Sequence, residues 1–240
     1  MKNTQLIVAL DVDNFDDAKN IIDQLEDSVE IFKIGSQLFT LYGPFITRYL
    51  QSLGKKVFLD LKFHDIPNTV ASAVKSAVQL SVSPNKQEGY EALYMLTVHT
   101  VGGEEMLKAA VKAKDEMAKK LKVAAPLIVG VTVLTSQAKD DTTDALVLER
   151  AMLAKRCGLD GVVASVEEAG MIRKHCGENF IIVTPGIRPA GAELADQKRV
   201  ATPKGAIKEG SNYLVVGRPI VQSNDPQEAA MAILDEINSK

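Results

Sequence analysis

The sequence predicts an α/β protein that folds as a single (β/α)8 barrel, the TIM barrel, over residues 1–240. Short apolar runs rich in β-branched residues alternate with longer amphipathic runs, which is typical of a parallel sheet with crossover helices. We count eight such pairs in the 240 residues, and a barrel of eight units takes about 250 residues. Because no linker or break in composition divides the chain, we expect one domain.

Each expected element is a segment of uniform character between polar or turn-forming residues. The strands are expected at 6–11, 30–35, 56–62, 93–99, 126–134, 160–165, 180–185 and 212–217. The helices are expected near 15–26, 37–53, 67–80, 103–120, 142–157, 166–175, 203–209 and 226–238. Pro67, Pro203 and Pro226 stand where three of these helices begin, a position that tolerates the missing N–H. The polar segment 81–92 is expected to be a loop at the bottom of the barrel, and an open doubly wound sheet is the alternative fold, because alternation alone does not show closure.

Composition and charge exclude several classes of protein. With 46% hydrophobic and 25% charged residues the chain is typical of a soluble globular protein. Its net charge of −3 and the lack of a basic cluster argue against a nucleic-acid partner. The apolar run from Leu6 to Leu10 is too short for a signal peptide or a membrane span. Two cysteines, Cys157 and Cys176, are too few for a disulfide framework and lack metal-ligand spacing. We therefore expect a cytoplasmic protein with no membrane partner.

Charged residues stand at the ends of the first three expected strands. Asp11 ends the first, Lys33 lies in the second, and Asp60 and Lys62 lie in the third, with Asp65 just beyond it. The carboxyl ends of the strands and the loops that follow form the active site of a TIM barrel. Side-chain alternation puts Asp60 and Lys62 on one face, which must be the inner face because helices cover the outside. A structural salt bridge explains one such charge, but burying a whole series is costly, so the set predicts a catalytic site.

A second polar cluster in the last quarter of the chain predicts a phosphate site. Arg188 follows the seventh expected strand, Gln197 lies in the loop after it, and Gly217 and Arg218 follow the eighth strand. Loops after strands 7 and 8 commonly bind phosphate in these barrels, in part through backbone N–H groups. The planar guanidinium of arginine matches phosphate oxygens. The structural alternatives are that Arg218 is a surface residue at a turn and that Arg188 only fixes its loop.

The three histidines give weaker indications. His64 lies among the charges of the third strand and His99 ends the fourth, where a metal-dependent phosphopentose epimerase would use His and Asp as ligands. A hydrogen-bonded structural histidine is the simpler explanation of both. His175 is expected in the last turn of a helix, where a cation interacts favourably with the helix dipole. We therefore expect no metal site.

Six short motifs are spread over the chain from end to end. They are ALD at 9–11, FKIG at 32–35, FLDLKFHDIPNT at 58–69, VLTS at 133–136, VTPGIRP at 183–189 and VVGRP at 215–219. Together they resemble the motifs of the orotidine 5'-phosphate decarboxylase family. The D-x-K-x-x-D part alone is shared with related barrels that decarboxylate keto-gulonate phosphate or synthesise hexulose phosphate, whereas its continuation into IPNT, with GIRP and GRP, is more specific. Segment 81–92 is longer than the resemblance leads us to expect.

The resemblance implies decarboxylation of orotidine 5'-monophosphate to UMP, in pyrimidine nucleotide biosynthesis, without a metal or an organic cofactor. It also implies a homodimer with active sites at the subunit interface. The catalytic residues would be Lys33, Asp60 and Lys62 of one subunit and Asp65 of the other. By the same resemblance, ribose hydroxyls would be held by Asp11 and Lys33 and by the partner's Asp65 and Thr69, the pyrimidine edge by Thr135 and Ser136, and the phosphate by Gln197, Gly217 and Arg218 with support from Arg188.

The chemistry of these residues suits that reaction. Loss of CO2 leaves electron density at C6 of the ring with no obvious sink, and Lys62, as an ammonium ion, would stabilise the charge and protonate the carbon. Lys33, Asp60, Lys62 and Asp65 alternate in sign, which favours the ammonium form of each lysine. Asp60 beside the substrate carboxylate would add ground-state repulsion. Two alternatives remain: a metal-dependent sugar-phosphate decarboxylase, aldolase or epimerase of the same barrel type, and a non-catalytic phosphate-ligand sensor.

Overall fold

The computed structural model describes residues 4–135, 139–189 and 201–239. These residues form a closed barrel of eight parallel strands in sequence order, so the barrel is confirmed and the open sheet is wrong. The ring closes where Gln5 to Val8 of the first strand pair with Tyr213 to Val216 of the eighth. The strands are β1 (Gln5–Ala9), β2 (Ile31–Gly35), β3 (Lys56–Phe63), β4 (Leu93–His99), β5 (Leu127–Val131), β6 (Gly161–Val163), β7 (Ile181–Thr184) and β8 (Tyr213–Val216).

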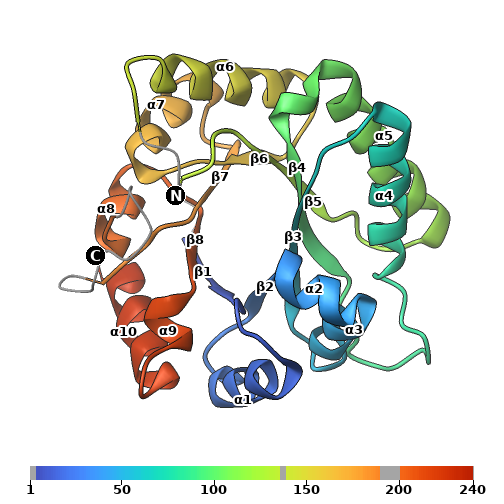
Figure 1. The fold of residues 1–240 in the computed structure, drawn as a ribbon, viewed down its shortest axis with the longest axis vertical. Coiled ribbons are helices and arrows are strands. Elements are labelled where there is room, and N and C mark those ends of the chain that lie inside the picture. The colour runs from blue at the N-terminus through green and yellow to red at the C-terminus, as the bar shows by residue number, and fades with distance from the viewer. Residues whose placement is uncertain (1–3, 136–138, 190–200, 240) are drawn as a thin grey trace.

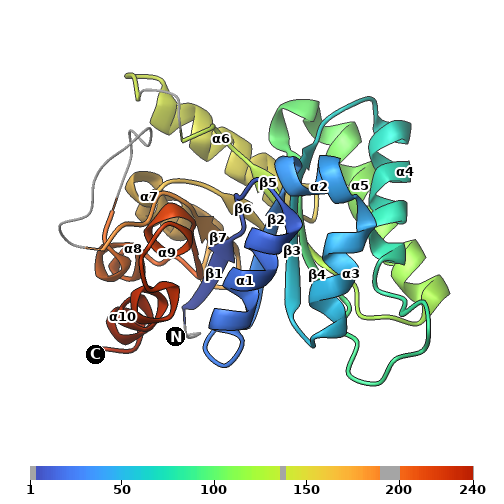
Figure 2. The same cartoon turned by 60° about the horizontal axis from the view of Figure 1, so that its bottom comes forward.

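Helices surround the strands on all sides (Figure 1). Helices α4 and α5 lie side by side outside β3 and β4 (Figure 2). No helix in the described part of the chain has the length and apolar character needed to cross a membrane. The helices are α1 (Phe15–Leu25), α2 (Ser36–Tyr42), α3 (Pro44–Ser52), α4 (Pro67–Gln79), α5 (Gly103–Leu121), α6 (Thr143–Arg156), α7 (Val166–Cys176), α8 (Pro203–Lys208), α9 (Arg218–Val221) and α10 (Pro226–Asn238), with a 3-10 turn η1 (Thr100–Gly102) before α5.

One expected helix, 37–53, is wrong in its extent. The structure has two helices there, α2 and α3, which are separated at Gly43. Pro44 begins α3 because proline has no N–H to donate to a preceding turn. Gly43 has a φ of 53°, a left-handed value that glycine adopts without a steric penalty, and its N–H donates to the Phe39 carbonyl oxygen. The short helix α9, directly after β8, was not expected from the sequence.

Side chains alternate between two apolar cores. On β1, Leu6 and Val8 face the helices, whereas Ile7 and Ala9 face the inside of the barrel. Alternation is expected because successive residues of a strand point to opposite faces. The inner core is fully apolar at mid-height and consists of Ile7, Ala9, Ile31, Phe58, Met95, Val129, Val183 and Val215.

Two tyrosines cross the lower end of the barrel. The hydroxyl groups of Tyr94 on β4 and Tyr213 on β8 lie 2.5 Å apart. Burial, with the hydrogen bond to Tyr94, raises the pKa of the Tyr213 phenol, which therefore stays neutral. Segment 81–92 is a loop between α4 and β4, as expected. Tyrosine packing thus fills the lower end, and the upper end is left to form a cavity.

Candidate active site

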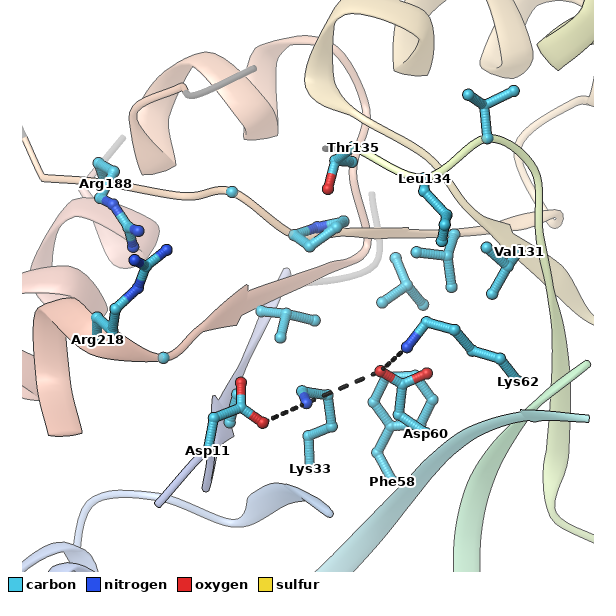
Figure 3. Close-up of a pocket in the computed structure, with 18 of the residues that line it drawn as sticks. Asp11, Lys33, Phe58, Asp60, Lys62, Val131, Leu134, Thr135, Arg188 and Arg218 are labelled. Carbon is cyan, nitrogen blue, oxygen red and sulfur yellow. Dashed lines mark hydrogen bonds and ion pairs between the residues drawn. The ribbon is translucent and has the colours of Figure 1, made fainter. Parts of the chain in front are cut away.

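A cavity of about 480 Å³ opens at the carboxyl ends of the strands. Asp60 and Lys62 lie toward one end of it, and Arg188 and Arg218 lie at the other (Figure 3). Several valine side chains also line it. Its lining includes Ala9, Asp11, Lys33, Phe58, Asp60, Lys62, Val131, Val133, Leu134, Thr135, Val163, Val183, Pro185, Gly186, Arg188, Val215, Gly217, Arg218 and Gln222.

Four charged residues form a continuous row along one side of the cavity. The Nζ atom of Lys33 lies 2.9 Å from Oδ1 of Asp11 and 3.8 Å from Oδ2 of Asp60. The Nζ atom of Lys62 lies 2.8 Å from the same Oδ2 of Asp60. Signs alternate along the row, so each ammonium group has a carboxylate neighbour. Asp60 is the most enclosed carboxylate of the row, with a side chain 13% exposed, against 53% for Asp11.

The strand pattern explains why these side chains meet. Ile7, Ile31 and Phe58 belong to the inner core, and Asp11, Lys33 and Asp60 follow on the same face of the chain at even spacing. The inward residues therefore change from apolar to charged toward the mouth of the barrel. Since strands β1, β2 and β3 are neighbours, the charges come together although they are far apart in sequence.

Lys62 departs from regular strand geometry. Its φ is 50°, in the left-handed region, where a residue with a side chain is strained by about 1–3 kcal/mol. The pairing of β3 with β4 passes from Leu59 opposite Leu96 to Phe63 opposite Val98, so three residues of β3 lie opposite Thr97 alone. From this bulge the Lys62 side chain extends to Asp60. Strand alternation predicted that both side chains face inward, but it did not predict the bulge.

Gly35 makes room for the row of charges. It ends β2, one inward position above Lys33. A Cβ atom at this position would lie 3.2 Å from Nζ of Lys33 and 3.3 Å from Oδ1 of Asp11, closer than ordinary van der Waals contact. The glycine of the FKIG motif thus lets the Lys33–Asp11 ion pair pass close to the backbone.

Two arginines lie together at the other end of the cavity. Arg188, after β7, and Arg218, after β8, point toward one another across the cavity from Lys62 (Figure 3). Arg188 is only 8% exposed. Two guanidinium groups in one enclosed place form a strong site for a doubly charged anion such as a phosphate monoester.

None of the three histidines lines the cavity, and two of them, His64 and His99, lie close together. The rings of His64 and His99 are 5.7 Å apart. Burial lowers the pKa of His99, and electrostatic interactions with His64, Arg150 and Lys62 lower it further. Among the described residues, His, Cys, Asp and Glu side chains form no group of three or more that could hold a metal ion.

Comparison with known proteins assigns the family. The sequence model of the orotidine 5'-phosphate decarboxylase / HUMPS family matches residues 4–233. The chain belongs to this family. The matched part contains all eight strands of the described barrel and every residue of the charged row.

Relatives named orotidine 5'-phosphate decarboxylase are similar over nearly their whole length. The protein of Vibrio cholerae is 45% identical over 247 residues, which cover 100% of this chain and 99% of that protein. The protein of Moorella thermoacetica is 46% identical over 242 residues, covering 97% and 92% of the two chains. The crystal structure of orotidine 5'-phosphate decarboxylase from Lactobacillus acidophilus superposes with a TM-score of 0.81 at 35% identity, over 99% of this chain and 100% of that one.

Most of the predicted site residues line the cavity at the carboxyl ends of the strands. They are Asp11, Lys33, Asp60, Lys62, Thr135, Arg188, Gly217 and Arg218. Asp65 and Thr69 are exposed and do not line it. Asp65 instead accepts a hydrogen bond from the N–H of Ile66. Ser136 and Gln197 lie outside the described residues, so their predicted roles stay predictions.

Sequence reasoning missed three residues of the site. Phe58 and Gln222 line the cavity, and Thr97 donates a hydrogen bond to Asp60 from behind the row. The position of Phe58, two residues before Asp60 on the inner face, was available from strand alternation. Thr97 and Gln222 carry no comparable signal, because their place depends on how β4 and α9 pack against other strands.

Proposed function

We propose that this chain decarboxylates orotidine 5'-monophosphate to UMP and CO2 without a metal or an organic cofactor, and that Lys62 protonates C6 of the product. Membership of the family makes the chain a carboxy-lyase of pyrimidine nucleotide biosynthesis. The observation that carries the finer proposal is the single cavity that has the Asp11–Lys33–Asp60–Lys62 row at one end and Arg188 with Arg218 at the other.

The charged row acts on the reacting carbon. Breaking the C6–carboxylate bond leaves its electron pair on C6 and releases CO2. The ammonium group of Lys62 stabilises this charge and then delivers its proton to C6, which gives UMP. Asp60 lies 2.8 Å from that ammonium group and holds it in place. A substrate carboxylate beside Asp60 is repelled, and the repulsion is relieved as CO2 leaves.

The remote end of the substrate supplies binding energy. Arg218, Gly217 and the segment that contains Gln197 take the phosphate, and Arg188 supports them. Asp11 and Lys33 take ribose hydroxyls, while Thr135 and Ser136 meet the pyrimidine edge. Because the phosphate and ribose do not react, their contacts serve to hold the pyrimidine against Lys62 and Asp60.

The active site is shared by two subunits. Asp65 and Thr69, after β3 and on α4, are exposed and do not line this chain's own cavity, so they can reach a partner's. Large apolar side chains are exposed after three neighbouring strands: Ile66 (66%), Val101 (50%) and Leu134 (38%). Apolar groups on this rim favour association, and a two-fold axis there carries each Asp65 to the other subunit's site.

The reaction takes place in the cytoplasm. Cys157 and Cys176 are both buried free thiols, and burial raises the pKa of each. Unpaired, unreactive cysteines suit a reducing compartment.

The test is a spectrophotometric assay of the purified protein with orotidine 5'-monophosphate. We expect absorbance to fall as the substrate is consumed, at the same rate before and after exhaustive chelation. A Lys62→Ala preparation, purified in the same way, controls for a contaminating enzyme. Activity that disappears on chelation and returns only with a divalent cation would indicate the metal-dependent alternative. Binding of the nucleotide without turnover would indicate a sensor.

A further inference from the structure

Thr97 lies directly behind the charged row, where β3 departs from regular pairing with β4. At the bulge, residues 60–62 of β3 face this single residue of β4. Thr97 itself is fully buried, and its own strand is held in register by pairing with Val129 of β5. The Thr97 side chain does not line the cavity, so any effect on the reaction must pass through its neighbours.

The Thr97 hydroxyl joins two parts of the bulge. Its Oγ1 atom accepts a hydrogen bond of 2.8 Å from the backbone N–H of Lys62. The same hydroxyl donates a hydrogen bond of 3.0 Å to Oδ1 of Asp60. A hydroxyl has one hydrogen to give and two lone pairs to accept with, so one Thr97 side chain satisfies both bonds at once. Because threonine is branched at Cβ, its rotamer is restricted and the oxygen has little freedom to turn away.

These two hydrogen bonds fix the orientation of the Asp60 carboxylate relative to Lys62 and Lys33. With Oδ1 committed to Thr97, the other oxygen, Oδ2, is the one that contacts both Lys62 and Lys33. The bond to the Lys62 N–H stabilises the backbone at the residue whose φ is 50°. Thr97 therefore touches both the carboxylate that orients the Lys62 ammonium group and the backbone from which that side chain starts.

We propose that Thr97 is a positioning residue for the decarboxylation: through its hydroxyl it fixes the Asp60 carboxylate and the bulged backbone of Lys62. The proposal rests on the proposed function for its effect on rate. If Thr97 served only for packing, valine would replace it without loss of activity, because valine has nearly the same shape. Valine would also leave the Lys62 N–H and one Asp60 oxygen without the Thr97 hydroxyl as a partner.

Two pairs of variants isolate the hydroxyl. Thr97→Val removes it and keeps the branched shape, while Thr97→Ser keeps it and removes the methyl group. Thr97→Ala and Thr97→Ser differ from each other only by the hydroxyl group. This second comparison replaces the first if the valine variant fails to fold. Thr47→Val is the matched control, because the buried Thr47 hydroxyl donates to the Pro44 carbonyl oxygen within α3, away from the cavity.

Steady-state kinetics with orotidine 5'-monophosphate is the first measurement. We expect Thr97→Val to lower kcat roughly 10- to 100-fold, the size of effect that a small misplacement of catalytic groups produces, with KM changed by less than about threefold. Thr97→Ser should stay within about threefold of the wild type, and Thr47→Val should have the wild-type kcat. A full kcat in Thr97→Val, or an equal loss in Thr97→Ser and Thr97→Val, would overturn the proposal.

Crystal structures of the variants give a readout that does not depend on turnover. We expect the Asp60 carboxylate to rotate, or to occupy two orientations, in Thr97→Val and Thr97→Ala, and to keep its place in Thr97→Ser. If the wild-type protein does not decarboxylate orotidine 5'-monophosphate, the proposed function fails and these structures alone decide the positioning role. An unmoved Asp60 and an unmoved Lys62 in the variants without the hydroxyl refute it.

Discussion

Asp60 is the residue on which the charged row depends. Its carboxylate contacts the ammonium groups of Lys62 and Lys33 and the hydroxyl of Thr97. A carboxylate so enclosed loses hydration at a cost of several kcal/mol, and these partners replace the lost water. Since the groups share one carboxylate, we expect substitutions within the row to be strongly non-additive.

Substitutions of Lys62 and of Arg218 should affect different kinetic parameters, kcat for the first and mainly KM for the second. We expect Lys62→Ala to lower kcat at least about 1000-fold, because it removes both the proton donor and a charge that stabilises the transition state. Arg218→Ala should instead reduce kcat/KM roughly 10- to 100-fold, mainly through KM, as loss of a charge-assisted bond to phosphate predicts. Steady-state kinetics on both variants is the measurement.

Lys19→Ala is the control for that pair, since it removes an exposed ammonium group on α1 that forms an ion pair with Asp23 in its own helix, away from the described lining of the cavity. Its kinetics should match those of the wild type. A Lys62→Ala enzyme with turnover within about tenfold of the wild type would show that another group donates the proton.

At the scale of single residues, the sequence predicts which charged residues belong to the site better than it predicts their backbone conformation and hydrogen-bond partners. Asp60 and Lys62 were predictable, because two charged residues on the inner face of a buried strand are costly without a function. The left-handed φ of Lys62 and the role of Thr97 were not, because they arise from pairing between β3 and β4. Thr97 is an ordinary strand residue in the sequence, and its partners lie more than 30 positions away.

At the scale of elements the order and type of all eight strands were predictable, since each is a short apolar run followed by an amphipathic one. The error at 37–53 arose from treating one amphipathic stretch as one helix, although the pair Gly43–Pro44 marks a break. Helix α9 has only four residues, Arg218–Val221, and this is too short to give a periodic pattern.

Helix α7 carries a residue that fixes the lower end of two strands. The Arg173 guanidinium donates hydrogen bonds of 2.7 Å to the carbonyl oxygens of Gly177, Phe180 and Gly210 and to Oδ1 of Asn212, which lie before β7 and β8. We expect Arg173→Ala to reduce the free energy of unfolding by about 3 kcal/mol, because three partly buried acceptors and one exposed acceptor lose a charged donor. Urea denaturation is the measurement.

The neighbouring Lys174 is exposed and supplies the control. Lys174→Ala should change the free energy of unfolding by less than about 0.5 kcal/mol. Both variants should keep the wild-type KM, since α7 contributes nothing to the described lining of the cavity. Equal stability of the two variants would contradict the role given to Arg173.

At the scale of the whole molecule the barrel leaves part of its own rim uncovered. Ile66, Val101 and Leu134 are exposed after β3, β4 and β5, beside the cavity mouth. The sequence does not reveal this, because an apolar residue after a strand is as consistent with the core as with an interface. The exposure of Asp65 next to Ile66 likewise appears only in the folded chain.

The proposed sharing of the active site between two subunits predicts how mixtures of two inactive proteins should behave. Lys62→Ala and Asp65→Ala should each be nearly inactive alone, because every site of either homodimer lacks one required group. In a mixed dimer one site carries both substitutions and the other carries neither. Random re-association gives about half mixed dimers, each with one intact site, so activity should recover to roughly a quarter of the wild-type value. Subunit exchange, followed with a mass-tagged chain, must be shown in the same sample. Lys62→Ala mixed with Asp60→Ala is the control that should not recover, since both groups line one chain's own cavity and every site of the mixed dimer lacks one of them. Continued inactivity of the first mixture after full exchange would place Asp65 in the site of its own chain.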